Sequence, residues 1–435
     1  MSRLNRRTFI TRAGAAASSV AVLSAFGPQA FAQDKQIRHF WWGNPERDKR
    51  TFAVIDLYNS KTPGTVVSGE TLGFADYFTK LTTQIAGGNM PDVIQQGYGV
   101  LFEYIANGAV VPLDDYIGKS LDISKIDQSA IDAGTVDGKF YALSIGANSH
   151  MAIYNTRLYE EAGIKVGEGA DFNPYGYTYD DLARIGAQIK EATGIPGTDD
   201  NTADYQNFSD FTAQKGVPMF NEDGSYGVTQ EIVEEYWSIW QAIRDAGATP
   251  PGPESAGLAG NSDLSQLGVV TGKSATSYLW SNQLVGAQGL VQDPLGAAMY
   301  PNTPEMIPGS VIQPSQFVCL TRDSVDPEAA TAYMSAFVND LDMTAILGLE
   351  RGIPSNAEVR AALEPNLSAA EAVSVAFFDA IQGKTAALPP PPPAGGNEVE
   401  QTFERVAVSV LLGEKSISEV ATDFLAQANA ILARA

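Results

Sequence analysis

The residues best suited to acid–base or nucleophilic chemistry are few in this chain of 435 residues. It contains two histidines, His39 and His150, and one cysteine, Cys319. His39 lies inside a predicted strand and Cys319 lies in the apolar run 316–320, so both are expected to pack in a core. His150 follows a predicted crossing between two halves of the chain. For this histidine, a structural role and a place in a cleft both stay open.

The sequence carries no motif of metal, nucleophile or nucleotide chemistry. H-E-x-x-H, C-x-x-C, G-x-S-x-G, Walker-A and helix-opening G-x-G-x-x-G patterns are all missing, so we expect no metal and no cofactor. Glycoside hydrolysis needs only two carboxylates, and the chain has 51 acidic residues. Solvated surfaces explain most of these acids, but a secreted carbohydrate-active enzyme stays an alternative.

Aromatic side chains follow several predicted strands, with amides and acids beside them. Trp42, Tyr98 and Trp280 each lie where a strand gives way to a loop, while alternation turns Trp41 to the opposite face from Trp42. Flat apolar rings next to hydrogen-bonding groups suit sugar rings. The neighbouring polar residues are Asn44, Glu46, Gln96, Asn148, Ser281 and Asn282. Trp237 and Trp240 lie three residues apart in a predicted helix and are expected in the core.

Alternating strands and helices must position these residues. Strands are predicted at 37–42, 65–70 and 90–96, and helices at 47–61, 77–86 and 101–106, with a loop at 97–99. This order indicates a mostly parallel sheet in an α/β fold. Ligands bind such sheets at the carboxyl ends of the strands, which is where Trp42 and Tyr98 are expected.

The pattern changes after Gly138. Two strand-like runs, 139–144 and 151–155, flank residues 145–150, which we interpret as a loop crossing between two lobes. Later helices are predicted at 179–192, 230–246, 398–412 and 417–433, with Thr178 as an N-cap. Residues 221–224 form a predicted turn without calcium ligands. Pro389–Pro393 is a polyproline II segment, expected as a stiff surface or interlobe loop.

Charge and the N-terminal segment bear on location and partners. The formal charge is −23, which argues against nucleic acid and anionic membranes. Residues 1–32 resemble a twin-arginine export signal, with Arg6-Arg7, a short apolar stretch and an Ala30-Phe31-Ala32 cleavage site. Removal of this segment takes away four arginines and no acids, so the charge becomes −27. We therefore expect a periplasmic protein.

Several segments in order resemble one known family. These are 37–43, then 81–93 (LTTQIAGGNMPDV), 151–164 (MAIYNTRLYEEAGI), 270–275 before Trp280, and 352–355. Together they look like family 1 of the extracellular solute-binding proteins, the maltose-binding-like sugar receptors of ABC importers. The similarity spans nearly the whole chain after the export signal.

The resemblance implies a periplasmic-binding-protein-like fold, with two α/β lobes joined by three crossovers and a carbohydrate held in the cleft between them. It places one lobe at 36–146 plus 317–351 and the other at 147–314 plus 354–435. It implies a monomer that delivers its ligand to the permease subunits of an ABC transporter. The contact positions implied by the family are Trp42, Gly43, Asn44, Glu46, Gln96, Tyr98, Asn148, Trp280 and Phe403, to which we add His150 and Arg351 from their placement near the crossings.

The chain also departs from the maltose-binding pattern. Gln96 stands where those receptors have an aromatic residue, and Asn44-Pro45-Glu46 replaces their acid–lysine pair. These differences leave the sugar open. Arg351 suits either a structural ion pair or an acidic group on the ligand, so a receptor of the same fold for a uronate, a sulfonate or another small solute is a second alternative.

Overall fold

The structure is a computed structural model that describes residues 34–221, 223–259, 263–390 and 392–434. The predicted export signal at 1–32 and Pro391 of the proline segment lie outside these residues. Within them, every helix is too short or too polar to cross a lipid bilayer.

A six-stranded sheet, here called the first sheet, has the strand order β11-β6-β10-β3-β1-β2. Strands β1, β2 and β3 run parallel, and β10 runs antiparallel to both β3 and β6. The strands of this sheet are β1 (Lys35–Trp42), β2 (Thr65–Leu72), β3 (Val93–Gln96), β6 (Ala142–Asn148), β10 (Gln313–Leu320) and β11 (Ile353–Pro354). The predicted parallel α/β core is therefore present.

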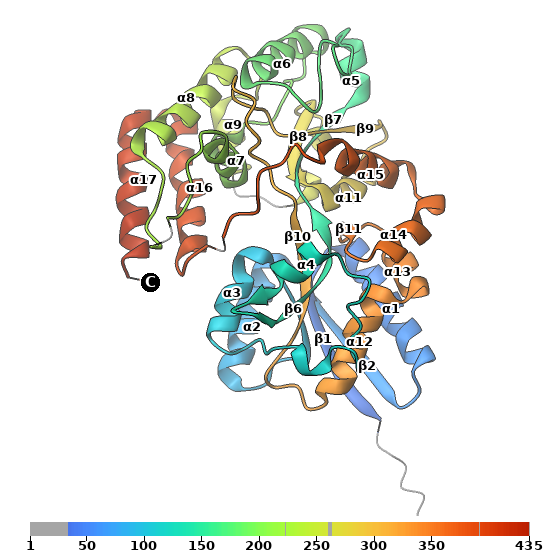
Figure 1. The fold of residues 1–435 in the computed structure, drawn as a ribbon. Coiled ribbons are helices and arrows are strands. Elements are labelled where there is room, and N and C mark those ends of the chain that lie inside the picture. Colours follow the sequence, from blue (N-terminus) through green and yellow to red (C-terminus); the bar gives the residue numbers. More distant parts are fainter. Residues whose placement is uncertain (1–33, 222, 260–262, 391, 435) are drawn as a thin grey trace, which may run out of the picture. The chain divides into compact units, whose positions relative to one another are not determined.

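Helices cover both faces of the first sheet (Figure 1). On one face, Ile37 and Trp41 of β1 pack with α1, α12 and α13. On the other, Phe40 and Ile94 pack with α2 and α3. Burial on both faces explains why β1 carries large apolar side chains toward either side of the sheet. The helices are α1 (Pro45–Lys61), α2 (Phe74–Gly87), α3 (Tyr98–Ala106), α12 (Pro327–Asn339) and α13 (Leu341–Leu347). The short elements α4 (Gln128–Ala133), β4 (Thr135–Val136) and β5 (Lys139–Phe140) precede β6.

A second sheet of three antiparallel strands has the order β8-β7-β9. Its strands are β7 (His150–Asn155), β8 (Thr276–Trp280) and β9 (Leu295–Ala298). One core cluster joins Ala152 and Tyr154 to α5, α6, α7, α8, α16 and α17, and another joins Met151 and Ile153 to α10, α11 and α15. Figure 1 shows the red helices α16 and α17 side by side near the green helix α8.

Four helices around the second sheet, α6, α8, α16 and α17, match the predicted positions closely, and the other helices there were not predicted. The helices around this sheet are α5 (Thr156–Glu161), α6 (Tyr179–Thr193), α7 (Tyr205–Gln214), α8 (Gln230–Asp245), α9 (Gly252–Ala256), α10 (Gly268–Thr271), α11 (Leu284–Gln288), α15 (Ala369–Ile381), α16 (Gly396–Leu412) and α17 (Ile417–Leu432). Thr178 caps α6 through a reciprocal bond with Asp181, as predicted. Trp237 and Trp240 are fully buried in the core, also as predicted.

The crossing at 145–150 differs from the prediction. Instead of a loop, β6 continues to Asn148 and β7 begins at His150, so Ser149 alone separates the two strands. The prediction of a loop is wrong because β10 and β11 pair with this stretch and satisfy its backbone groups. Gly146 permits this close pairing, since a Cβ there would lie 2.7 Å from the carbonyl oxygen of Ile353. The stretch nevertheless leads directly from the first sheet to the second.

The return from the first sheet comes later in the chain than the predicted boundary at 351–354. Helix α14 (Ala357–Leu363) packs on α13, and Arg360 forms an ion pair with Asp127, 2.7 Å between Nη1 and Oδ2. Helix α15, by contrast, packs on α11 and β9 of the second sheet. Residues 357–363 thus lie with the first sheet, although the predicted boundary groups them with the other lobe.

Candidate ligand-binding site

Three of the predicted site residues lie at one edge of the first sheet. Because β6 and β3 are both antiparallel to β10, they run in the same direction, which is also the direction of β1. Trp42, Gln96 and Asn148 are the last residues of β1, β3 and β6, at the carboxyl ends of these strands, and Asn148 extends four residues beyond Ser144, the β6 residue level with Gln96. That edge is the usual ligand-binding edge of an open α/β sheet.

Trp42 lies half-buried at the end of β1. Its ring is 5.6 Å from that of Phe74, 5.2 Å from Tyr77 and 5.6 Å from Phe78, measured between centroids. Trp41 turns to the opposite face, is fully buried, and donates its Nε1–H to Asp48 Oδ1 at 2.9 Å. The alternation of β1 therefore keeps Trp42 for the site and assigns Trp41 to the core.

Gln96 has the most unusual surroundings among the predicted site residues. Its side chain is 0% exposed, yet neither its Oε1 nor its Nε2 has a hydrogen-bond partner among the described residues. Buried amides in folded proteins are nearly always bonded, because an unsatisfied buried group costs about 1–3 kcal/mol. The adjacent Gln95 is bonded: its Nε2 donates to the carbonyl oxygen of Trp42, and its Oε1 accepts from Arg351. Unsatisfied groups of this kind are typical of positions that receive a ligand or water.

The crossing brings a second group of predicted residues together. Asn148 donates its Nδ2–H to Asn282 Oδ1 at 3.1 Å, while its own Oδ1 has no partner in the described part of the chain. One residue later the backbones of Ser149 and Ser281 bond, with Ser281 N donating to Ser149 O at 2.9 Å. These bonds hold the end of β8 against the crossing.

His150 and Trp280 are paired across β7 and β8. Their ring centroids are 4.2 Å apart, and the imidazole is also stacked on Tyr300 at 5.3 Å. His150 is buried, and its Nδ1 lies 2.8 Å from Oδ1 of Asp210. Trp280 remains half-buried. The second sheet thus presents an aromatic ring and a histidine beside the crossing.

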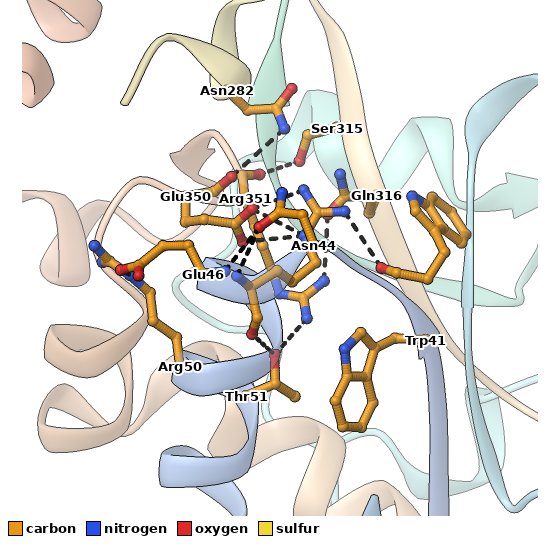
Figure 2. A network of polar contacts seen from close by, with 12 residues as sticks. Trp41, Asn44, Glu46, Arg50, Thr51, Asn282, Ser315, Gln316, Glu350 and Arg351 are labelled. Atoms are coloured by element: carbon orange, nitrogen blue, oxygen red, sulfur yellow. Dashed lines mark hydrogen bonds and ion pairs between the residues drawn. The ribbon is translucent and has the colours of Figure 1, made fainter. Parts of the chain in front are cut away.

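Arg351 lies in a buried polar network between the first sheet and α1, shown in Figure 2. Its guanidinium donates to Gln95 Oε1, to Thr51 Oγ1 at 2.7 Å, and to Gln316 Oε1 at 3.4 Å. It also lies over the ring of Phe337. Burial, together with the nearby charge of Arg47, lowers the pKa of Arg351 to about 9. Since both terminal nitrogens are bonded to protein, the arrangement does not present Arg351 as an open fork for an anion.

Glu350 extends the same network toward the second sheet. It forms a buried ion pair with Arg47 of α1, with Arg47 Nε 2.9 Å from Oε1. Its backbone carbonyl accepts from Asn282 Nδ2 at 3.5 Å. Asn282 therefore bonds to both Asn148 and Glu350. Because Glu350 also bonds to Arg47, the crossing is connected to α1.

The remaining predicted site residues lie elsewhere. Asn44 is the N-cap of α1, where its Oδ1 accepts from two backbone N–H groups, and Glu46 bonds to Arg50 at 2.7 Å. Tyr98 is the first residue of α3 rather than part of a loop, and its hydroxyl donates to the carbonyl oxygen of Pro389 at 3.1 Å. Phe403 is fully buried and stacks on Phe208 at 4.5 Å.

Gly43 serves the turn after β1. A Cβ at this position would lie 2.0 Å from Oδ1 of Asp48, the oxygen that also accepts from Trp41. Within the described residues, the side chains of Asn44, Glu46, Tyr98 and Phe403 thus bond or pack with other parts of the protein and, like Gly43, make no hydrogen bond to Gln96 or to Oδ1 of Asn148.

Sequence reasoning missed two neighbours of the site. Phe74, 55% exposed, begins α2 beside Trp42, and the end of β2 at Leu72 is the signal that could have located it. Asp210, which holds His150, lies in the middle of α7 and has no local signal. Among the described residues, no group of three or more His, Cys, Asp or Glu side chains is arranged to hold a metal ion.

Sequence comparisons relate the chain to binding proteins. The family model of the bacterial extracellular solute-binding proteins matches residues 53–374. A putative binding protein of Brucella abortus is 27% identical over 237 residues, or 53% of this chain and 55% of that protein. An arabinooligosaccharide-binding protein of Halalkalibacterium halodurans is 26% identical over 135 residues, or 31% of this chain and 28% of that protein. The chain thus spans about half the length of the first relative and less of the second.

Solved structures share the fold over most of the chain. An extracellular solute-binding protein of family 1 from Alicyclobacillus acidocaldarius is 27% identical, with a TM-score of 0.70, covering 91% of this chain and 98% of that one. A periplasmic oligogalacturonide-binding protein from Yersinia enterocolitica, solved with saturated digalacturonic acid, is 21% identical, with a TM-score of 0.79, covering 92% and 99%. These likenesses confirm the predicted periplasmic-binding-protein-like α/β fold.

Proposed function

Because the chain belongs to the bacterial extracellular solute-binding proteins, we propose that it is a receptor that captures a carbohydrate and delivers it to the permease subunits of an ABC importer. The ligand is a mono- or oligosaccharide that contacts both sheets at the crossing. The receptor releases it chemically unchanged and needs no cofactor.

One observation carries the proposal. Buried polar atoms without partners in the described chain occur at the ends of β3 and β6 and at the start of β7: both side-chain atoms of Gln96, Oδ1 of Asn148 and Nε2 of His150. Half-buried Trp42 is the last residue of β1 in the first sheet, and half-buried Trp280 is the last residue of β8 in the second sheet. Aromatic faces and convergent amides match the apolar C–H faces and the hydroxyl groups of a sugar.

Hinge closure is the proposed mechanism. A ligand that bonds to Gln96 on the first sheet and to His150 on the second stabilises the closed arrangement more than the open one, and so shifts the population toward closure. Ser149 is one hinge point, since the chain passes there from β6 to β7 without any intervening loop. For the two lobes we propose the boundaries predicted from the sequence, with α14 assigned to the first lobe because it packs on α13.

Export and location complete the proposal. The Arg6-Arg7 pair and the Ala30-Phe31-Ala32 site support transport by the twin-arginine route, with a periplasmic receptor as the product. The names of relatives point to the ligand class: one is an arabinooligosaccharide-binding protein and another, from Rhizobium radiobacter, is a lactose-binding protein. We propose a neutral sugar in preference to a uronate, because Arg351 is bonded within the protein.

A thermal-shift screen tests this function. The protein without residues 1–32 is heated with a panel of neutral mono- and oligosaccharides and with acidic oligosaccharides. A sugar at about 100 times its Kd is expected to stabilise the folded state by about 2.7 kcal/mol and to raise the Tm. Recovery of the ligand intact after incubation, by mass spectrometry, separates a receptor from an enzyme. A panel without any Tm shift, or cleavage of the sugar, would contradict the proposal.

A further inference from the structure

His150 is held by a buried carboxylate in a defined orientation. Oδ1 of Asp210, on α7, lies 2.8 Å from Nδ1 of the imidazole, and Oδ2 of the same carboxylate accepts from Ser310 Oγ at 2.5 Å. All three side chains are buried. With both carboxylate oxygens engaged, Asp210 fixes the ring of His150 and determines that Nδ1 carries a hydrogen.

The segment that supplies Ser310 is built to approach α7 closely. Gly309 makes this possible, because a Cβ there would lie 2.2 Å from the backbone carbonyl oxygen of Asp210. The carbonyl oxygen of Ser310 accepts from Ala386 N at 2.9 Å, which fixes the segment from its other side. The carboxylate therefore cannot rotate away from His150 without breaking these contacts.

The other ring nitrogen faces a different situation. Nε2 of His150 lies across the imidazole from Asp210, is buried, and has no hydrogen-bond partner in the described part of the chain. The ring is flanked by Trp280 at 4.2 Å and Tyr300 at 5.3 Å. Of the two nitrogens, Nε2 is thus the one left to meet a ligand at the site proposed above.

The charges around His150 favour its protonated form. Burial by itself lowers the pKa of His150, but the charge of Asp210 and its hydrogen bond, and then the charges of Asp204 on α7 and Glu400 on α16, raise it above 6.5. Tyr300, whose own pKa is raised well above 10 by burial, stays neutral beside it. In the protonated ring both nitrogens are donors.

We propose that Asp210 is a positioning residue that keeps His150 as an oriented imidazolium whose Nε2–H donates to an oxygen atom of the bound sugar. This inference rests on the proposed function. The sugar oxygen at this point must accept a hydrogen bond, which selects ligands that carry a hydroxyl, ring or carboxyl oxygen there over deoxy analogues. Sugar affinity must then fall as the pH rises through the pKa of His150.

The first measurement needs no ligand. The chain has two histidines, so NMR of protein labelled at histidine shows only two imidazoles between pH 5 and 9.5. His39 stays constant over this range, because burial and the charge of Arg351 lower its pKa to about 3. His150 is expected to titrate with a pKa above 6.5 in the wild type and at a lower pH in Asp210→Asn. If Asp210→Asn does not fold, Ser310→Ala, which keeps the charge and removes one anchor of the carboxylate, takes its place.

The second measurement is the affinity for a sugar found in the screen, by calorimetry across the same pH range. The wild type is expected to lose about tenfold in affinity as His150 deprotonates, because the neutral ring keeps its hydrogen on Nδ1 and no longer donates from Nε2. Asp210→Asn should show this loss already near neutral pH and recover at acid pH, which a merely structural defect would not do. His150→Gln keeps a neutral donor and should remove the pH dependence. Asp199→Asn is the matched control, since it removes a carboxylate that bonds to Ser274 instead.

The outcomes separate this inference from the proposed function. Parallel shifts of the His150 titration and the affinity profile in Asp210→Asn support it. A pH-independent affinity in the wild type, or a His150 titration that Asp210→Asn leaves unchanged, overturns the inference while the receptor function stands. Failure of every sugar to bind in the initial screen overturns both.

Discussion

Arg47 and Glu350 form a buried ion pair across 303 residues of sequence, with Arg47 Nε 2.9 Å from Glu350 Oε1 and side chains only 6% and 8% exposed. The pair joins the helix after Trp42 to the segment that carries Arg351. Arg47 Nη1 also donates to the carbonyl oxygen of Trp42 at 3.4 Å, so the pair supports the end of β1 directly.

Glu350→Gln is expected to lower the free energy of unfolding by about 3–5 kcal/mol, because it leaves the charge of Arg47 buried without a counter-charge. Urea unfolding followed by circular dichroism measures this. Glu161→Gln breaks an exposed ion pair with Arg157 and should cost less than about 1 kcal/mol. Equal effects of the two substitutions would show that the buried pair has no special role.

The two histidines should act on stability with opposite signs. His39 is buried, its Nδ1 lies 2.9 Å from the hydroxyl of Tyr333, and burial followed by the charge of Arg351 lowers its pKa to about 3. The unfolded chain binds a proton at His39 near pH 6.5, so the stability from this group is fully present above pH 6.5 and is lost as the pH falls toward 3. For His150, whose pKa is raised, the stability is present below pH 6.5 and is lost as the pH rises through the folded pKa.

Unfolding free energies of the wild type and His39→Asn, measured from pH 7.5 to pH 4, test this difference. The wild type should lose up to about 1.4 kcal/mol more per pH unit than the variant over the acid part of the range. Asparagine retains a polar group near the position of Nδ1 but does not titrate. Parallel pH profiles for the two proteins would rule out a buried neutral imidazole at position 39.

The sequence predicts the local features of the fold and misses the long-range partners. Alternation along β1 separated buried Trp41 from half-buried Trp42, and helical spacing placed Trp237 in the core, because both patterns depend only on nearby residues. The stretch 145–150 was mistaken for a loop because its pairing with β10 and β11 comes from residues more than 150 positions away.

The same limit applies to the site. Strand ends could be located from the sequence, which is why Gln96 and Trp280 were predicted there, whereas Asn148 was predicted from the crossing and not from a strand end. The bonds from Asp210 to His150 and from Arg351 to Gln95 span 60 and 256 residues, and no spacing in the sequence indicates them. A helix face such as that of α7 shows that a carboxylate is present but not which side chain it meets.

Trp280→Ala and Trp42→Ala should each weaken binding of a confirmed sugar by about 1 kcal/mol or more, because each removes an aromatic face from the proposed site. Calorimetry at 25 °C measures the change. Trp237→Phe is the control: Trp237 is fully buried in α8, so its substitution should lower the Tm but leave the affinity of the folded protein unchanged. An unaltered affinity in Trp280→Ala would remove this residue from the site.

Gln95 and Gln96 are neighbours in β3 and both fully buried, yet leucine should have opposite effects on stability at the two positions. Gln96→Leu removes two unbonded polar atoms and is expected to raise the free energy of unfolding of the ligand-free protein by about 1–3 kcal/mol, while weakening sugar binding at least tenfold. Gln95→Leu removes the acceptor for Arg351 and should destabilise the protein, because it leaves a buried guanidinium N–H unbonded. Urea unfolding and calorimetry on both variants measure the two quantities. If Gln96→Leu were destabilising and bound sugar normally, the glutamine would be a structural residue, and the proposed site would lose its main contact on the first sheet.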